Sequence, residues 1–134
     1  MEFDKTTQDA LKLIHEGNHI IFREVGRVCE KYHLNYFLDS GNLIGAVREK
    51  SDIPWDDDAD IAMTRKDFEV FRKVARTELK DGFVYVEPDE LNGAFYDFVP
   101  RVVMLDSTMR ENNAEQKYYG NGIHNPVSYT HLTL

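Results

Sequence analysis

The sequence lacks several features that would place it in a specialised class of protein. It contains one cysteine, Cys29, so an internal disulfide is excluded, and a reducing compartment is consistent with this usage. No apolar run approaches the roughly 20 residues of a membrane-spanning helix. The opening residues, MEFDKTTQDA, lack the basic-then-apolar order of a signal peptide. We therefore expect a soluble cytoplasmic protein with no integral membrane segment.

Basic residues are also scarce. The chain has 16 Lys and Arg against 24 Asp and Glu, a net charge of −8, which disfavours nonspecific binding to nucleic acid because phosphate contacts need clustered basic side chains. What is present suits a globular core, since 42% of the 134 residues are hydrophobic and 12% are aromatic. This length supports one domain rather than two.

Hydrophobic periodicity and turn residues predict a mixed series of helices and strands. Thr6 is expected to cap a long helix over residues 6–32, in which Cys29 is a small core residue, and Thr64 to cap a second helix that stops near Gly82. Asn42 is expected to cap a short helix over 43–48. The expected strands cover residues 35–38, 58–63, 83–86, 94–98 and 101–105. This order predicts an α+β (mixed α/β) domain with a small mixed sheet flanked by helices.

The stretch IPWDDDADIAM, residues 53–63, packs four carboxylates into five positions before an apolar run. If the strand includes Asp58, then Asp58 and Asp60 share one face, Asp56 joins them if the strand starts early, and Asp57 points away. Facing carboxylates repel unless a cation lies between them, and Mg²⁺ or Mn²⁺ accepts carboxylates together with phosphate oxygens. An acidic surface turn is the plain alternative. A calcium-binding EF-hand loop fails, because Ile61 replaces its glycine.

The turn before this stretch is typical of an anion-binding site. A strand, then Ser40 and Gly41, then a helix start would present backbone N–H groups to a phosphate, with Gly41 allowing close approach. Arg48 is expected to pair with a second phosphate. Trp55 is either a shelf for a base or sugar or a buried core aromatic.

Residues 36–48, YFLDSGNLIGAVR, together with residues 53–63, resemble the signature of the LicD family. These are phosphocholine-transferase-like, fukutin-related proteins of the nucleotidyltransferase-fold superfamily. The resemblance implies a Mg²⁺-dependent enzyme that transfers phosphocholine or a similar group from a CDP-type nucleotide donor to a glycan acceptor in lipopolysaccharide or teichoic acid, with at most a peripheral position at the inner membrane face. It implies metal ligands at Asp58 and Asp60, and substrate contacts at Ser40, Gly41, Asn42, Arg48 and Trp55.

The resemblance also predicts which part of the chain forms the domain. Residues 1–125 are interpreted as a partial LicD-like domain, with the helix at 6–32 and a catalytic core at 35–125, whereas residues 126–134 resemble translated vector sequence and are expected to be a non-native tail. The superfamily needs a third carboxylate on a later strand. We place this carboxylate beyond residue 125 and expect this chain to be inactive or nearly so, with Asp97 as the alternative. A non-catalytic fragment with weak or no nucleotide binding is therefore the alternative.

A competing motif occurs in the first helix. His15-Glu16-Gly17-Asn18-His19 matches the HExxH pattern of zinc hydrolases, in which two histidines four residues apart bind zinc. His15 is expected at the edge of the apolar stripe and His19 closer to solvent, and Gly17 costs about 1 kcal/mol in mid-helix. We therefore favour the transferase over the zinc hydrolase.

Overall fold

A computed structural model of the chain describes residues 3–87, 99–105 and 129–133, the last as backbone only. Its elements, in chain order, are α1 (Lys5–Lys31), β1 (Phe37–Leu38), α2 (Ser40–Ile44), the π-helix η1 (Gly45–Glu49), β2 (Asp60–Ala62), α3 (Arg65–Glu78), β3 (Phe83–Val86), β4 (Arg101–Met104) and β5 (Tyr129–Thr133). Helices and strands are mixed along the chain, so the predicted α+β class is confirmed.

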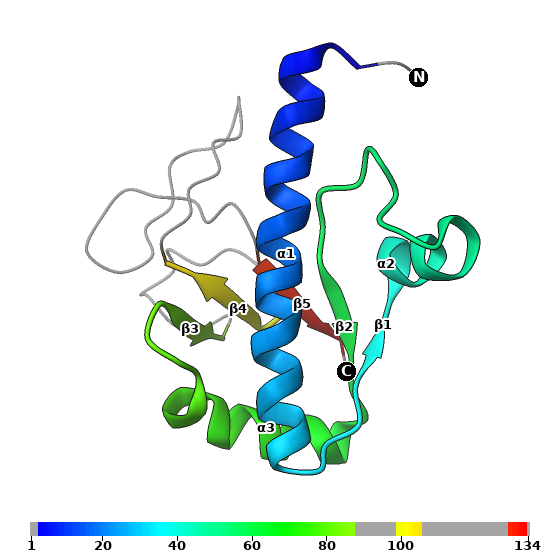
Figure 1. The fold of residues 1–134 in the computed structure, drawn as a ribbon. Helices are drawn as coiled ribbons and strands as arrows, with labels where there is room; N and C mark the ends of the chain where they lie inside the picture. The colour runs from blue at the N-terminus through cyan, green and yellow to red at the C-terminus, as the bar shows by residue number, and fades with distance from the viewer. Residues whose placement is uncertain (1–2, 88–98, 106–128, 134) are drawn as a thin grey trace.

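The five strands form one sheet in the order β1-β2-β5-β4-β3. β5 runs parallel to β2 and antiparallel to β4, whereas the two outer pairs, β1–β2 and β3–β4, are antiparallel. In Figure 1, α1 crosses in front of this sheet and α3 runs below it, while β1 and α2 lie on the far side of β2. α1 contacts β4, β5 and α3, so the long helix ties the layers together.

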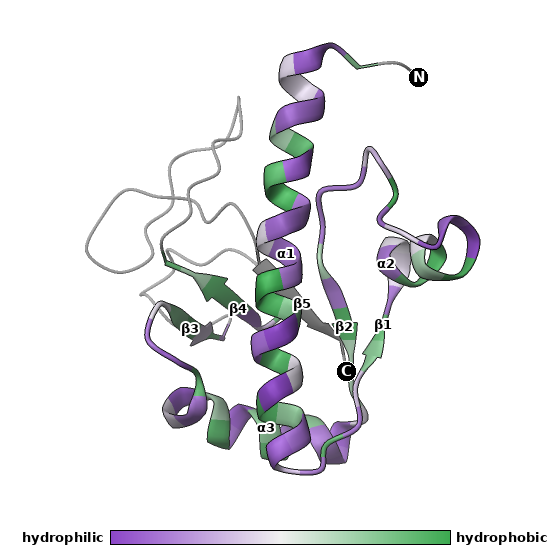
Figure 2. Ribbon diagram, in the orientation of Figure 1, coloured by the Kyte–Doolittle hydropathy of each residue, from purple (hydrophilic) through white to green (hydrophobic). Residues whose placement is uncertain are grey.

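The core lies between the two long helices and the sheet. α1 contributes Ile21, Val25, Val28 and Cys29, α3 contributes Phe68, Phe71 and Ala75, and the strands contribute Ile61, Tyr85 and Val102. Figure 2 shows β1 and β4 largely in the hydrophobic colour and the segment before β2 mostly in the hydrophilic one. The helical stripe read from the sequence is therefore the buried face of α1, and Cys29 is a core residue, as predicted.

The two predicted helix caps had different outcomes. Thr64 caps α3 by accepting a hydrogen bond from the Asp67 amide at 3.2 Å, as the sequence predicts. The expected cap at Thr6 is wrong, because Asp4 caps α1 and its Oδ1 accepts from the Thr7 amide at 2.8 Å. A carboxylate accepts this hydrogen bond as readily as a hydroxyl, and Asp4 begins the helix two residues earlier.

The bounds of the short helix and of α3 also differ from the expectation. The short helix starts at Ser40 rather than after Asn42, because the side chain of Asn42 is engaged with the chain near β2. α3 ends at Glu78, and Gly82, with φ of 95°, instead forms the turn into β3. The strand expected over 94–98, with Asp97, lies outside the described residues.

Residues 126–134 were interpreted as a non-native tail and left out of the expected fold. The structure places the backbone of residues 129–133 as β5, between β2 and β4 in the middle of the sheet. Tyr129 and two threonines give this stretch a high strand propensity. The vector origin of residues 126–134 stays a prediction.

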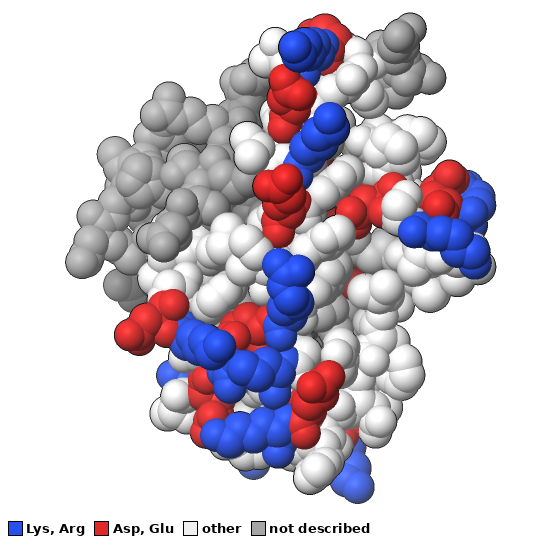
Figure 3. All heavy atoms as spheres, in the orientation of Figure 1, with Lys and Arg blue, Asp and Glu red and all other residues white. Residues whose placement is uncertain are grey.

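Charges of both signs cover the helical face of the molecule. Figure 3 shows Lys or Arg alternating with Asp or Glu down the length of α1. Within the described residues, no helix combines the length and apolar character needed to cross a bilayer.

Candidate functional site

The acidic cluster lies in the segment that leads into β2. A turn closed by the Asp56 amide and the Ile53 carbonyl, at 3.1 Å, begins it. Carboxylate oxygens of Asp56, Asp57 and Asp58 all lie within 4.8 Å of one another. Three carboxylates this close suit a hard divalent cation.

The aspartates that lie together are not the ones that strand alternation predicts. β2 begins only at Asp60, so Asp58 precedes the strand and does not alternate with Asp60 as a strand residue would. Asp57 does not point away but joins Asp56 and Asp58, whereas Asp60 is not part of that group of three. The sequence shows the density of carboxylates, but the local turn decides which of them meet.

Burial and the neighbouring carboxylates determine the pKa of the Asp56 carboxyl. Burial raises the pKa of its carboxyl above the ordinary value, and the negative charges of neighbouring aspartates raise it further, against a lowering by the hydrogen bond from the Asp58 amide. Both effects disfavour the charged form. A bound cation would favour the charged form instead.

Two asparagines fix the backbone that carries these carboxylates. Asn42 Nδ2 donates to the Asp58 carbonyl at 3.2 Å, and its Oδ1 accepts from the Asp60 amide at 2.7 Å. Asn18, buried in α1, donates to the carbonyls of Asp57 and Asp58 at 3.3 and 3.2 Å. Asn42 was predicted as a site residue on other grounds. Asn18 was not predicted, although a polar residue on the buried face of α1 was a signal that could have found it.

Gly41 approaches this cluster more closely than any side chain would permit. A Cβ added to Gly41 would lie 1.8 Å from Asp56 Oδ2, so the glycine accommodates the Asp56 carboxylate. The preceding Ser40 has a positive φ of 49°, which turns the chain at the start of α2. The group that approaches Gly41 closely in the structure is the Asp56 carboxylate of the chain itself, and the approach of a phosphate stays a prediction.

Replacing Gly41 with alanine is expected to lower the free energy of unfolding by roughly 1 kcal/mol or less, because the added methyl group displaces the half-buried Asp56 carboxylate, which can rotate aside. Chemical denaturation measures this change. In an Asp56→Ala background the same substitution should cost much less, since the clash is then gone. A Gly41→Ala cost that is the same in the parent and in the Asp56→Ala background would contradict the close contact.

The other predicted substrate residues lie at the surface. Trp55 is 53% exposed, so its interpretation as a buried core residue is wrong, and its ring is accessible. Arg48 lies in η1 and pairs with Glu49 through Nε and Oε1 at 2.6 Å. Asp97 lies outside the described residues.

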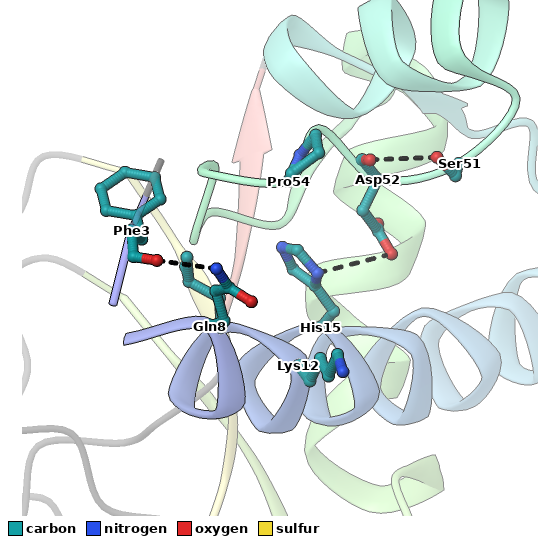
Figure 4. A pocket seen from close by; sticks show the side chains of 8 residues that line it. Phe3, Gln8, Lys12, His15, Ser51, Asp52 and Pro54 are labelled. Atoms are coloured by element: carbon teal, nitrogen blue, oxygen red, sulfur yellow. Dashed lines mark hydrogen bonds and ion pairs between the residues drawn. The ribbon is translucent and has the colours of Figure 1, made fainter. Parts of the chain in front are cut away.

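Both histidines of the HExxH motif face the same segment. His15 Nε2 lies 2.6 Å from the Asp56 carbonyl oxygen, and His19 Nε2 lies 2.8 Å from Asp52 Oδ2. The side chain of His15 is 17% exposed and that of His19 is 49% exposed, in the order the helix predicts. Figure 4 shows His15 and Asp52 facing each other at a pocket of about 480 Å³ between α1 and this segment.

Comparison with known proteins decides the family. The family model described as LicD/FKTN/FKRP, nucleotidyltransferase domain, matches residues 33–118, which is more than half of the chain. The chain belongs to this family. The LicD match includes the turn at Gly41 and the acidic cluster, whereas α1 with its two histidines lies before it.

Several curated proteins are similar to short stretches of this chain. The lipopolysaccharide cholinephosphotransferase LicD of Haemophilus influenzae is 50% identical over 44 residues, which cover 33% of this chain and 17% of that protein. Uncharacterized proteins of Rickettsia typhi and Rickettsia prowazekii are 33% identical over 54 residues and 36% identical over 47 residues. These matches cover 40% and 35% of this chain, and 18% of each relative. The chain thus aligns with less than a fifth of the length of each of these relatives, and no solved structure matches it.

Proposed function

We propose that this chain carries the metal-binding and donor-binding part of a phosphocholine transferase that acts on lipopolysaccharide glycan. Its membership of the LicD family and its likeness to the Haemophilus cholinephosphotransferase support the reaction class. The observation that carries the proposal is the group of Asp56, Asp57 and Asp58, whose carboxylates crowd together beside Gly41. The proposed donor is a CDP-activated phosphocholine or a related compound, and the proposed fold relationship is to the nucleotidyltransferase superfamily.

The residues present fit a hard divalent ion such as Mg²⁺ or Mn²⁺. Asp58 is proposed as a ligand by both the family resemblance and the geometry. The resemblance adds Asp60, whereas the geometry adds Asp56 and Asp57. A bound Mg²⁺ would neutralise negative charge on the donor diphosphate. Burial, and to a lesser extent the neighbouring aspartates, raise the pKa of the Asp56 carboxyl, and a bound cation would favour its charged form.

The remaining site residues position groups around that ion. Asn42 holds the backbone on both sides of Ala59, through the Asp58 carbonyl and the Asp60 amide, and thereby sets where Asp58 lies. The exposed ring of Trp55 is proposed to stack on the base or sugar of the donor. Ser40, Gly41 and Arg48 are proposed to lie near its phosphates, with Arg48 exchanging Glu49 for phosphate. The carboxylate that activates the acceptor hydroxyl is proposed to lie on a later strand beyond residue 125, with Asp97 as the alternative.

The metal proposal predicts a selective loss on substitution of Asp58. Mn²⁺ is expected to raise the melting temperature of the chain, and Asp58→Asn should remove most of that rise because this carboxylate belongs to both proposed ligand sets. Asp81→Asn, at an exposed position in the turn before β3, is the matched control and should retain it. Thermal unfolding with and without Mn²⁺ measures the effect.

Two further measurements distinguish the two proposed ligand sets and test the proposed function. A larger loss with Asp60→Asn than with Asp57→Asn would favour the ligands inferred from the family, and the reverse would favour those inferred from the turn. CDP-choline binding followed by calorimetry should depend on Mg²⁺ and fail in Asp58→Asn. Equal Mn²⁺ responses in the Asp58 and Asp81 variants would reduce the cluster to a diffuse acidic surface and overturn the proposal.

A further inference from the structure

One turn of α1 contacts the backbone of the acidic cluster. His15 Nε2 lies 2.6 Å from the Asp56 carbonyl oxygen. Asn18 Nδ2 donates to the carbonyls of Asp57 and Asp58 at 3.3 and 3.2 Å. Residues three apart on a helix lie on one face, so both side chains reach the segment from the same side of α1. Three consecutive carbonyls therefore accept hydrogen bonds from a single helical turn.

The chemistry of these acceptors fixes the orientation of both side chains. A carbonyl oxygen only accepts, so His15 carries a proton on Nε2 and Asn18 presents its Nδ2 to the segment. Asn18 is 2% exposed, and within the described part of the chain its Oδ1 is buried without a hydrogen-bond partner. Such an oxygen costs stability, which leucine, of similar volume, would avoid. A role in holding the segment accounts for asparagine here better than stability does.

The three carbonyls also show the shape of the segment. In an extended chain, successive carbonyls and successive side chains alternate in direction. The carbonyls of residues 56–58 instead all accept from α1, so this stretch is curled. The curl explains why Asp57 joins Asp56 and Asp58, with carboxylate oxygens within 4.8 Å of one another.

We propose, on the basis of the metal site in the proposed function, that His15 and Asn18 are positioning residues of that site, which hold residues 56–58 in the curl that brings their carboxylates together. α1 then belongs to the metal site, although it ends at Lys31, before the residues that match the family. The HExxH stretch receives a role without zinc, because His15 donates to a carbonyl and Glu16 is exposed.

The Mn²⁺ affinity of the folded chain, measured by calorimetry, tests the role of Asn18. Asn18→Leu removes both donors at similar volume, and we expect Mn²⁺ binding to weaken about tenfold, as on loss of other outer contacts of metal sites. Its urea denaturation midpoint without metal should stay close to that of the parent, because the unpartnered Oδ1 is removed as well. A purely structural role predicts the opposite pattern, a lower midpoint and an unchanged affinity.

A pair of variants tests His15 in the same titration. His15→Leu removes the donor and should weaken Mn²⁺ binding to a similar extent. The Gln amide nitrogen extends about as far as histidine Nε2 and keeps an N–H, so His15→Gln should restore most of the affinity. This comparison remains decisive if one substitution lowers stability, since both variants lose the ring.

Two neighbouring positions of α1 serve as controls. Glu16→Gln, at an exposed position between the two proposed residues, should bind Mn²⁺ as the parent does. His19→Ala removes a contact with the Asp52 carboxylate and leaves the carbonyl contacts in place, so it should also bind as the parent does. A zinc-type pair would instead make His15 and His19 equally important.

Parent-like Mn²⁺ affinity in Asn18→Leu, or equal losses in His15→Leu and His15→Gln, would overturn the positioning role. If Asp58→Asn still abolishes Mn²⁺ binding in that case, the proposed function stands without it. No Mn²⁺ binding by the parent chain would overturn both.

Discussion

Truncating Phe71 to alanine is expected to lower the free energy of unfolding by about 3–5 kcal/mol. Its ring is 0% exposed in the core between α3 and the sheet, and it meets Tyr85 edge-to-face with centroids 6.0 Å apart. Removing it loses the burial of the ring, leaves a cavity and removes the aromatic pair. Chemical denaturation followed by circular dichroism measures the change.

The preceding residue is the matched control for Phe71. Val70 lies on the same helix but is 38% exposed, so Val70→Ala should change stability by roughly 0.5 kcal/mol or less. If Phe71→Ala prevents folding, Phe71→Leu retains part of the ring volume and should give an intermediate loss. Similar small losses at both positions would show that α3 does not present this face to the core. β2 leads directly into α3, so the same packing holds the end of the strand that follows the acidic cluster.

Replacing Glu24 with glutamine is expected to lower the free energy of unfolding by roughly 2–3 kcal/mol at pH 7. The Glu24 carboxylate is buried in α1 and accepts from Arg27 Nε and Nη2 at 3.1 and 2.6 Å, and from the Lys80 amide at 2.9 Å. Arg27 also donates to the Glu78 carbonyl at 2.6 Å. This network joins α1 to the end of α3, and a neutral amide satisfies it less well.

The effect of Glu24→Gln should depend on pH in a defined direction. Burial raises the pKa of the Glu24 carboxyl, but the hydrogen bonds from Arg27 and Lys80 outweigh it, so the folded-state pKa lies below the ordinary value of 4.5. The charged group therefore stabilises the fold above pH 4.5, and this contribution is lost as the pH falls through the folded-state pKa.

Denaturation at a series of pH values measures the pH dependence of the Glu24 contribution. The stability difference between the parent and Glu24→Gln should shrink below pH 4.5, the ordinary value for this group. Glu30→Gln, at an exposed position of the same helix, is the control and should show little change. A difference that is constant with pH would mean that the lost contribution is steric and not ionic.

The sequence alone determined the elements whose signals are local. α3 was predictable from the Thr64 cap and the spacing of Phe68, Phe71 and Ala75, because a helix satisfies its own backbone and shows its buried face as a periodicity. β3 was predicted with its observed bounds, since it follows a turn signal and consists of residue types that favour strands. The family could also be predicted from the sequence, because its motifs are contiguous stretches such as residues 53–63.

The tertiary structure alone decided which side chains meet. Strand alternation paired Asp58 with Asp60, but the chain enters β2 later, and a turn brings Asp57 to Asp56 and Asp58. The contact of Asp52 with the histidines joins residues more than 30 positions apart, and that of Asn42 with Asp58 joins two elements of different type. Such contacts depend on how α1 and α2 pack against β2. Residue type predicted the kind of chemistry expected in this region. Its geometry was decided only by the packing of the helices on the sheet, because no local sequence pattern records the distance between two elements.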